Sequence, residues 1–226
     1  MRFPGAPITI DFETEAITKP GVPPKPVGVA IKKLGRFGAY HAWGHPTENN
    51  CTVEDGWAEL RAVWDKPLLF HNAAFDIAVA MKHFNLPFPK HYHDTLFMLY
   101  LVDPHADTIS LKPAAEKYLG IPPDEQEEVR QWLVEHGVVR PNQKEWGGHI
   151  SEAPGTLVGK YAVGDVERTR ELYNTLLRAL DAREQEAYLR ELALLPILLD
   201  NERTGMRLDV DRLSKDIVVY EGALAK

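Results

Sequence analysis

Two acidic residues lie two positions apart in the apolar segment ITIDFE at residues 8–13. Side chains alternate between the two faces of a strand, so Asp11 and Glu13 share one face while Ile10 and Phe12 share the other. A carboxylate pair near a strand end can hold a cation, because α/β proteins gather their sites there. Two surface acids at a strand tip have the same spacing, so this pair alone leaves both readings open.

A second acid follows the buried segment that ends at Phe70. Residues 70–76 read FHNAAFD, which predicts a strand end followed by a helix start with Asn72 as a possible N-cap. Asp76 then lies in the first helical turn. It is either a site residue or a solvated acid that interacts favourably with the helix dipole.

A third motif, YAVGD at residues 161–165, lies in a long predicted helix. Tyr161 and Asp165 are four residues apart and share a helix face. The apolar stripe of this helix includes Val158, Ala162 and Leu172, so Asp165 falls on the side that faces the core. A buried carboxylate needs a partner, which is a metal ion, a local hydrogen bond or an arginine.

The three motifs place four carboxylates at sheet ends or helix starts, where they can converge. Two carboxylates 4 Å apart repel by roughly 4 kcal/mol at an effective dielectric constant of 20, so such a cluster needs protons or cations. Oxygen ligands favour Mg²⁺ or Mn²⁺ over zinc. Two such ions can bind a phosphodiester and activate a water molecule for its hydrolysis.

A zinc site is the competing metal hypothesis, and it rests on His41, His45 and Cys51. The two histidines span a glycine-containing turn, and no fourth ligand is evident. The single cysteine excludes an internal disulfide and a cysteine-rich zinc module.

The order of predicted elements indicates an α/β protein with a mixed sheet flanked by helices. Strands are expected over residues 7–12, 27–32, 38–43 and 68–70, and helices over 52–65, 73–84, 94–101, 110–119, 125–135 and 156–180. The Pro- and Gly-rich stretch 121–155 is expected to be mobile and solvent-facing around its one short helix.

Composition excludes several classes of protein. Of 226 residues, 44% are hydrophobic and 26% charged, which is typical of a globular chain. The formal net charge of -7 argues against broad phosphate neutralisation, although bound metal ions can bring nucleic acid to an acidic site. The chain lacks a signal-peptide stretch at its start and any apolar run long enough for a membrane span, so we expect a cytoplasmic protein.

The tail is predicted to be helical over residues 182–203, with a second helix after Asp209. Its apolar stripe of Tyr188, Leu192, Leu195 and Leu199 is expected to pack against this domain or another one. The last helix has no stop signal, so we expect the chain to be a fragment of a longer protein.

Five motifs in order resemble the proofreading 3′–5′ exonuclease domain of family A (polymerase I-like) DNA polymerases, of the tyrosine-type DEDD group. The resemblance covers about residues 5–180 and rests on DFET (11–14), HNAAFD (71–76), HDTLFMLYL (93–101), SLKPAAEKYLG (110–120) and YAVGD (161–165). It implies an RNase H-like fold with a C-terminal helical tail. The segment 191–209 resembles the connection to a polymerase domain, which implies domains at 1–180 and 181–226.

The resemblance also implies residue roles. Asp11, Glu13 and Asp165 would hold one metal ion, and Asp11 and Asp76 would hold a second. Tyr161 would orient the attacking water, and Lys160 stands where a related subgroup has histidine. The pocket for the 3′-terminal nucleotide would be lined by Thr14, Ile17, Asn72 and Phe75, while Asp94 is expected to be a structural hydrogen-bonding acid.

The expected function is therefore Mg²⁺- or Mn²⁺-dependent removal of 3′-terminal nucleotides from single-stranded or frayed DNA, with a polymerase domain in the same protein. Two alternatives remain at this point. One is an RNase D-type 3′–5′ exoribonuclease, and the other is a non-catalytic exonuclease fold that serves as a structural module.

Overall fold

The computed structural model describes residues 6–122 and 124–225. Its five strands form one mixed sheet in the order β3-β2-β1-β4-β5, in which β1 pairs antiparallel with β2 and parallel with β4. β2 and β3 are antiparallel, and β4 and β5 are parallel. The strands are β1 (Ile8–Thr14), β2 (Pro26–Lys32), β3 (Ala39–Ala42), β4 (Leu68–Phe70) and β5 (Tyr92–Asp94).

Helices follow the strands in the order that the sequence predicts, with boundaries within a few residues. They are α1 (Val53–Arg61), α2 (Ala73–Phe84), α3 (Thr95–Val102), α4 (Leu111–Leu119), α5 (Asp124–Glu135), the 3-10 helix η1 (Gly147–Glu152), α6 (Gly155–Ala179), α7 (Ala182–Thr204) and α8 (Val210–Leu224).

The two faces of the sheet carry different helices. Ile10 and Phe12 of β1 point into a core shared with α1 and α2. Cores on the opposite face pack α5 and α6 against β2 and β3, and α3, α4 and α6 against β4. Because β1 alternates, its acidic residues face α6, which crosses β1, β2, β3 and β4.

Strand β1 extends two residues beyond its predicted end at Phe12. Asp11 and Glu13 therefore lie within a hydrogen-bonded strand instead of at its tip, with Asp11 opposite Ala30 and Glu13 opposite Gly28. A register shift follows between Glu13 and Thr14. The backbone of both acids is fixed by the sheet.

The stretch 121–155 is only in part the solvent-facing segment that its Pro and Gly content suggested, since many of its described residues are exposed but several apolar ones are buried. Val129, Leu133 and Ile150 are buried with Trp146 against α6 and β3. The prediction missed these buried side chains because apolar residues separated by polar ones in a Gly-rich segment can still reach a neighbouring core once the chain turns back on it.

Strand β5 was not predicted. It is only three residues long and pairs with β4, and its His93 is buried. Such a short strand shows no alternation that a sequence pattern could reveal.

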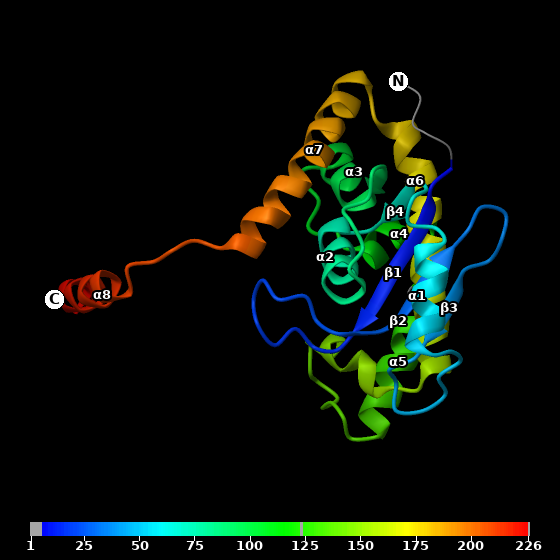
Figure 1. Cartoon of the computed structure of the whole chain (residues 1–226), viewed down its shortest axis with the longest axis horizontal. Coiled ribbons are helices and arrows are strands. Elements are labelled where there is room, and N and C mark those ends of the chain that lie inside the picture. Colours follow the sequence, from blue (N-terminus) through cyan, green and yellow to red (C-terminus); the bar gives the residue numbers. More distant parts are fainter. Residues whose placement is uncertain (1–5, 123, 226) are drawn as a thin grey trace.

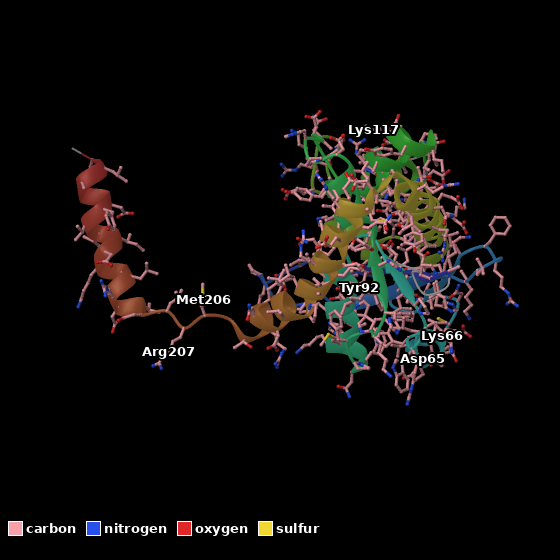
Figure 2. All side chains as sticks on the ribbon, turned by 90° about the horizontal axis from the view of Figure 1, so that it is seen from above. Asp65, Lys66, Tyr92, Lys117, Met206 and Arg207 are labelled. Carbon is pink, nitrogen blue, oxygen red and sulfur yellow. The ribbon has the colours of Figure 1, made fainter. Side chains whose placement is uncertain are left out.

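The tail consists of one packed and one projecting helix. Tyr188 and Leu195 of α7 are buried against the domain, with Leu192 and Leu199 half-buried beside them, which confirms the predicted stripe. Figure 1 shows α7 along the side of the domain and α8 standing away from it. Met206 and Arg207 mark the extended connection in Figure 2, and every described residue of α8 is exposed. Within the described residues, no helix is long and apolar enough to cross a membrane.

Candidate active site

Three carboxylates from two distant segments meet between β1 and α6. Asp11, Glu13 and Asp165 each offer one oxygen within 4.8 Å of the others. Glu13 and Asp165 are buried and Asp11 is half-buried. The two β1 acids are on one face because of strand alternation, and Asp165 faces them because the apolar stripe of α6 packs on the same face of the sheet.

Asp76 lies beside this group without belonging to it. It is 2% exposed, and its Oδ1 accepts a hydrogen bond of 2.9 Å from the backbone amide of Phe12. This bond ties the start of α2 to β1. The Asp11 charge also acts on Asp76, so the fourth predicted ligand is a near neighbour of the first.

Burial and mutual repulsion make these carboxylates weak acids in the absence of cations. Burial, followed by the charge of Asp165, raises the pKa of Asp11 from 3.8 to about 7. Burial and the neighbouring charges of Asp11 and Asp165 raise the pKa of Glu13 well above its ordinary value. The pKa of Asp76 is raised for the same two reasons, burial first and the Asp11 charge second.

Asp165 has two cationic neighbours. Its Oδ2 lies 2.6 Å from Lys112 Nζ, and its Oδ1 lies 3.6 Å from Arg168 Nη1. Burial still raises the pKa of Asp165, although both cations lower it. Oδ1 is buried and accepts no hydrogen bond from the described residues. The arginine partner considered from the sequence is therefore present at ion-pair distance from Oδ1, but it donates no hydrogen bond to that oxygen.

Tyr161 lies beside the three-carboxylate group, one helical turn before Asp165 on α6. Burial, followed by the Asp165 charge, raises the pKa of its hydroxyl well above 10, so the phenol keeps its proton. The Lys112 ammonium lies 3.9 Å from the centre of its ring. A protonated hydroxyl beside the carboxylates can donate a hydrogen bond to a water molecule.

The donor set fits Mg²⁺ or Mn²⁺. It consists of carboxylate oxygens, which these ions prefer, and it includes the buried Asp165 oxygen that lacks a hydrogen bond. The structure does not support the zinc site considered above, because His45 and Cys51 are engaged in hydrogen bonds with other groups. His45 is bonded through Nε2 to the Tyr40 hydroxyl and through Nδ1 to the Ala153 carbonyl, and Cys51 Sγ donates to the Ala42 carbonyl. Among the described residues, the acid group is the one set of three possible ligands that meets.

The start of α2 is capped by Asp94 instead of Asn72. Asn72 has a left-handed backbone (φ 70°) and its side chain makes no capping bond. The Asp94 carboxylate accepts from the amides of Asn72 and Ala73 at 2.9 and 2.8 Å, and from Leu96 at 2.8 Å. The expectation that Asp94 is a structural hydrogen-bonding acid is confirmed by these contacts.

The residues predicted to line a nucleotide pocket lie around the ends of β1 and α2. Thr14 ends β1, Ile17 follows it in a loop with 64% of its surface exposed, and Asn72 is exposed before α2. Phe75 is half-buried and packs on the core beneath α2. Their roles remain a prediction, as do the metal-binding and catalytic roles of the acids and Tyr161.

Sequence reasoning considered an arginine beside Asp165 but named neither Arg168 nor Lys112. Arg168 is buried, bridges Asp165 to Glu125 of α5 and donates to the Pro122 carbonyl. Its position three residues after Asp165 on one helix face is a signal that could have revealed it. Lys112 comes from α4, 53 residues before Asp165, and its spacing carries no such signal.

Comparison with protein families decides the family. A model of the 3′–5′ exonuclease family of family A DNA polymerases matches residues 4–181. The chain belongs to this family. The resemblance inferred from the five motifs is therefore confirmed, and the three-carboxylate group lies within the residues that the family model matches.

Two phage DNA polymerases are similar in sequence to this exonuclease. The DNA polymerase of Escherichia phage T5 is 26% identical over 221 residues, which cover 92% of this chain and 25% of that protein. DNA polymerase DpoZ of Vibrio phage phiVC8 is 26% identical over 170 residues, covering 70% and 26%. The chain thus spans about a quarter of the length of these relatives.

Solved structures show the same fold at low sequence identity. Brucella melitensis NrnC with bound Mg²⁺ superimposes with a TM-score of 0.61 at 16% identity, covering 88% of this chain and 86% of that one. Escherichia coli RNase D, an exoribonuclease involved in structured RNA processing, gives a TM-score of 0.54 at 17% identity, covering 86% and 45%. The fold is RNase H-like, a mixed sheet flanked by helices, as predicted.

Proposed function

We propose that this exonuclease removes nucleotides from the 3′ end of single-stranded or frayed DNA and releases nucleoside 5′-monophosphates. The observation that carries the proposal is the meeting of Asp11, Glu13 and Asp165 within 4.8 Å, together with an Asp165 oxygen that accepts no hydrogen bond from the described residues. Buried acids in this arrangement are all ionised at neutral pH only when cations offset their mutual repulsion.

The carboxylates hold the cofactor in this proposal. Asp11, Glu13 and Asp165 bind one Mg²⁺ or Mn²⁺, and Asp11 and Asp76 bind a second, with Asp76 still tied to Phe12. When bound, the two ions supply positive charge to the attacking and leaving oxygens of the phosphodiester. Mg²⁺ in the NrnC structure of the same fold supports this choice of metal.

The remaining residues position water and substrate. The Tyr161 hydroxyl, which keeps its proton, donates to the attacking water and aims it at the phosphorus. Thr14, Ile17, Asn72 and Phe75 surround the terminal nucleotide, and Phe75 offers an aromatic surface that contacts a base without reading its identity. Fraying a mismatched end costs less free energy than fraying a paired end, so errors are removed preferentially.

DNA is the proposed substrate because both sequence relatives are DNA polymerases. For the same reason we propose that residues 1–180 form the exonuclease domain and that residues 181–226 lead into a polymerase domain of the same protein. Its working place would then be a bacterial cell or a phage-infected one. An exoribonuclease is the alternative outcome, since the fold is shared with RNase D.

The test is a digestion of 3′-labelled single-stranded DNA with Mg²⁺ or with EDTA, in which product size is resolved. We expect a labelled mononucleotide with Mg²⁺ only, and its loss by a factor of about 10³ or more in Asp11→Ala and Asp165→Ala. Asp65→Ala is the matched control, because Asp65 is an exposed acid outside the three-carboxylate group, and Figure 2 labels it at the lower edge of the domain.

Three results would contradict the proposal. Faster digestion of RNA of the same sequence would assign the enzyme to RNA. Unchanged activity in both site variants, with folding verified by circular dichroism, would remove the acids from the mechanism, and no Mg²⁺-dependent activity in the wild-type chain would favour a non-catalytic module.

A further inference from the structure

Lys112 reaches the acidic cluster from a helix that carries none of its acids. It is the second residue of α4, which packs against α6. Its side chain is only 12% exposed, and its Nζ lies 2.6 Å from Asp165 Oδ2. The same ammonium lies 3.9 Å from the centre of the Tyr161 ring. One flexible side chain thus contacts both residues that α6 contributes to the site.

The Lys112 charge acts on all three carboxylates of the cluster. It lowers the pKa of Asp11 and of Glu13 as well as that of Asp165, although burial outweighs it in each case. The ammonium therefore interacts electrostatically with the whole group. Its ion pair with Asp165 places it beside an oxygen that is also a candidate metal ligand.

Arg168 is the other cation beside Asp165, and its charge is engaged elsewhere. It forms an ion pair of 2.5 Å with Glu125 and donates to the Pro122 carbonyl, whereas its distance to Asp165 is 3.6 Å. Arg168 is 3% exposed, and its Nη2 makes both of these bonds, whereas its Nη1 and Nε donate no hydrogen bond among the described residues. The Lys112 ammonium stands on a flexible four-carbon stem, so it can withdraw from Asp165 by rotation of the side chain, giving up only its contact with the Tyr161 ring.

A divalent ion that binds Asp165 meets this positive charge at short range. Like charges a few ångströms apart repel strongly where water is largely excluded. The ion must also displace the ammonium from the Asp165 carboxylate, with which it already forms an ion pair. Binding of the metal is therefore opposed by the same lysine that relieves repulsion among the acids when the metal is absent.

We propose that the Lys112 ammonium is the counter-cation of the metal-free acidic cluster and that divalent ions bind in competition with it. The inference rests on the proposed function, because it concerns ions held by Asp11, Glu13 and Asp165. It assigns Lys112 a positioning role on Asp165 and Tyr161 and makes it a determinant of metal affinity. The lysine keeps the empty site folded and weakens the affinity of the filled one.

The experiment is calorimetric titration of Mn²⁺ into the full chain, comparing the wild type with Lys112→Met. Methionine keeps an unbranched stem against the Tyr161 ring and removes the charge. We expect Lys112→Met to bind Mn²⁺ about tenfold more tightly, because a repelling charge is removed. Its Tm in EDTA should be lower than that of the wild type, and its gain in Tm on adding Mn²⁺ should be larger.

Lys117→Met is the matched control. Lys117 lies five residues along the same helix and pairs with the half-buried Asp103 at 2.7 Å, and Figure 2 labels it at the top of the domain. Lys117→Met removes an equal charge from a residue that does not contact the acidic cluster, so the Mn²⁺ affinity of this variant should equal that of the wild type. Lys112→Arg, which keeps the charge, should bind Mn²⁺ as weakly as the wild type. If Lys112→Met does not fold in EDTA, Lys112→Gln is titrated in its place.

The sign of the change decides the inference. A merely structural role of Lys112 predicts weaker Mn²⁺ binding in the variant, because a distorted site loses ligands. Unchanged or weaker Mn²⁺ binding by Lys112→Met would therefore overturn the proposed competition. The proposed function would stand in that case if the wild type binds Mn²⁺ and digests DNA. A wild-type chain that binds no Mn²⁺ and digests no DNA overturns both.

Discussion

At the scale of single residues, the alternation of side chains along β1 places the acidic residues on one face of the sheet and the apolar core residues on the other. Ile10 and Phe12 enter the core with α1 and α2, and Asp11 and Glu13 face α6. On the neighbouring strand β2, the residue that pairs with Glu13 is Gly28, which has no side chain on the face that carries the acids. The Tyr40 hydroxyl fills the space beside Gly28, and it is held by His45, which is bonded in turn to the Ala153 carbonyl.

Gly28→Ala tests this close approach. A Cβ at Gly28 would lie 2.1 Å from the Tyr40 hydroxyl oxygen, so the ring must move and strain its bond to His45. We expect a loss of about 1–3 kcal/mol in the free energy of unfolding, measured with urea. Gly147→Ala, where no atom lies within 4 Å of the added carbon, should cost little by comparison. Equal stability of the two variants would show that Tyr40 relaxes freely.

The raised pKa of Asp11 gives the metal-free protein a distinctive pH dependence. Its pKa is about 7 in the folded protein and 3.8 ordinarily, so between these values the folded state binds more protons. The contribution of Asp11 to stability is thus complete below pH 3.8 and is lost as pH rises through 7.

We expect the Tm in EDTA to fall over that range and the gain in Tm from Mg²⁺ to be largest above pH 7. A concentration of 100 times the dissociation constant adds about 2.7 kcal/mol. Differential scanning calorimetry of the wild type and Asp11→Asn isolates this group, because asparagine does not titrate. An equally steep fall in both proteins would assign the effect to other residues.

At the scale of elements, helix ends and docking surfaces hold the site in place. β5 and α2 are joined by the Asp94 carboxylate, which caps α2 four residues before Asp76. α7 reaches the same region, since the Asp94 amide donates to the Tyr188 hydroxyl at 2.9 Å. The helix of the tail is thus part of the support of α2, although no acid of the site lies on it.

Leu195→Ala tests the docking of α7. Leu195 is 3% exposed in the core with α2, while its neighbour Leu194 is 45% exposed on the same helix. We expect a loss of about 2–5 kcal/mol in the free energy of unfolding for Leu195→Ala and a much smaller change for Leu194→Ala. Chemical denaturation measures both. A small effect of Leu195→Ala would mean that α7 detaches from the domain at little cost.

For the whole molecule, charge sets how nucleic acid is approached. The chain has 26 basic and 33 acidic residues, and three carboxylates converge in its site. A phosphate backbone is repelled by such a surface unless divalent ions reverse the sign of the potential locally. Binding of substrate and binding of metal are therefore coupled in the proposed function.

This coupling predicts that single-stranded DNA binds far more weakly in EDTA than in Mn²⁺. We expect a difference of about tenfold or more, measured by fluorescence anisotropy with an oligonucleotide whose terminal linkages are phosphorothioates to slow cleavage. The difference should shrink in Asp165→Ala and persist in Asp65→Ala. Equal affinity with and without metal would locate the DNA on a surface remote from the acids.

Much of the fold and of the site follows from local sequence patterns. The alternation at residues 8–13, the buried segment at 68–70 and the stripe of α6 predicted elements that the structure contains, because each element buries one face. The motifs around Asp11, Asp76 and Asp165 predicted the family, and the order of strands and helices predicted a mixed sheet.

Only the tertiary structure decided which groups share the space between β1 and α6. Lys112 lies on another helix, and nothing in its local sequence states that its ammonium ends 2.6 Å from Asp165. The burial of Val129, Leu133 and Ile150, the strand at 92–94 and the capping of α2 by Asp94 were decided in the same way. A sequence pattern reports how one element divides its faces, whereas partners across elements depend on how those faces pack.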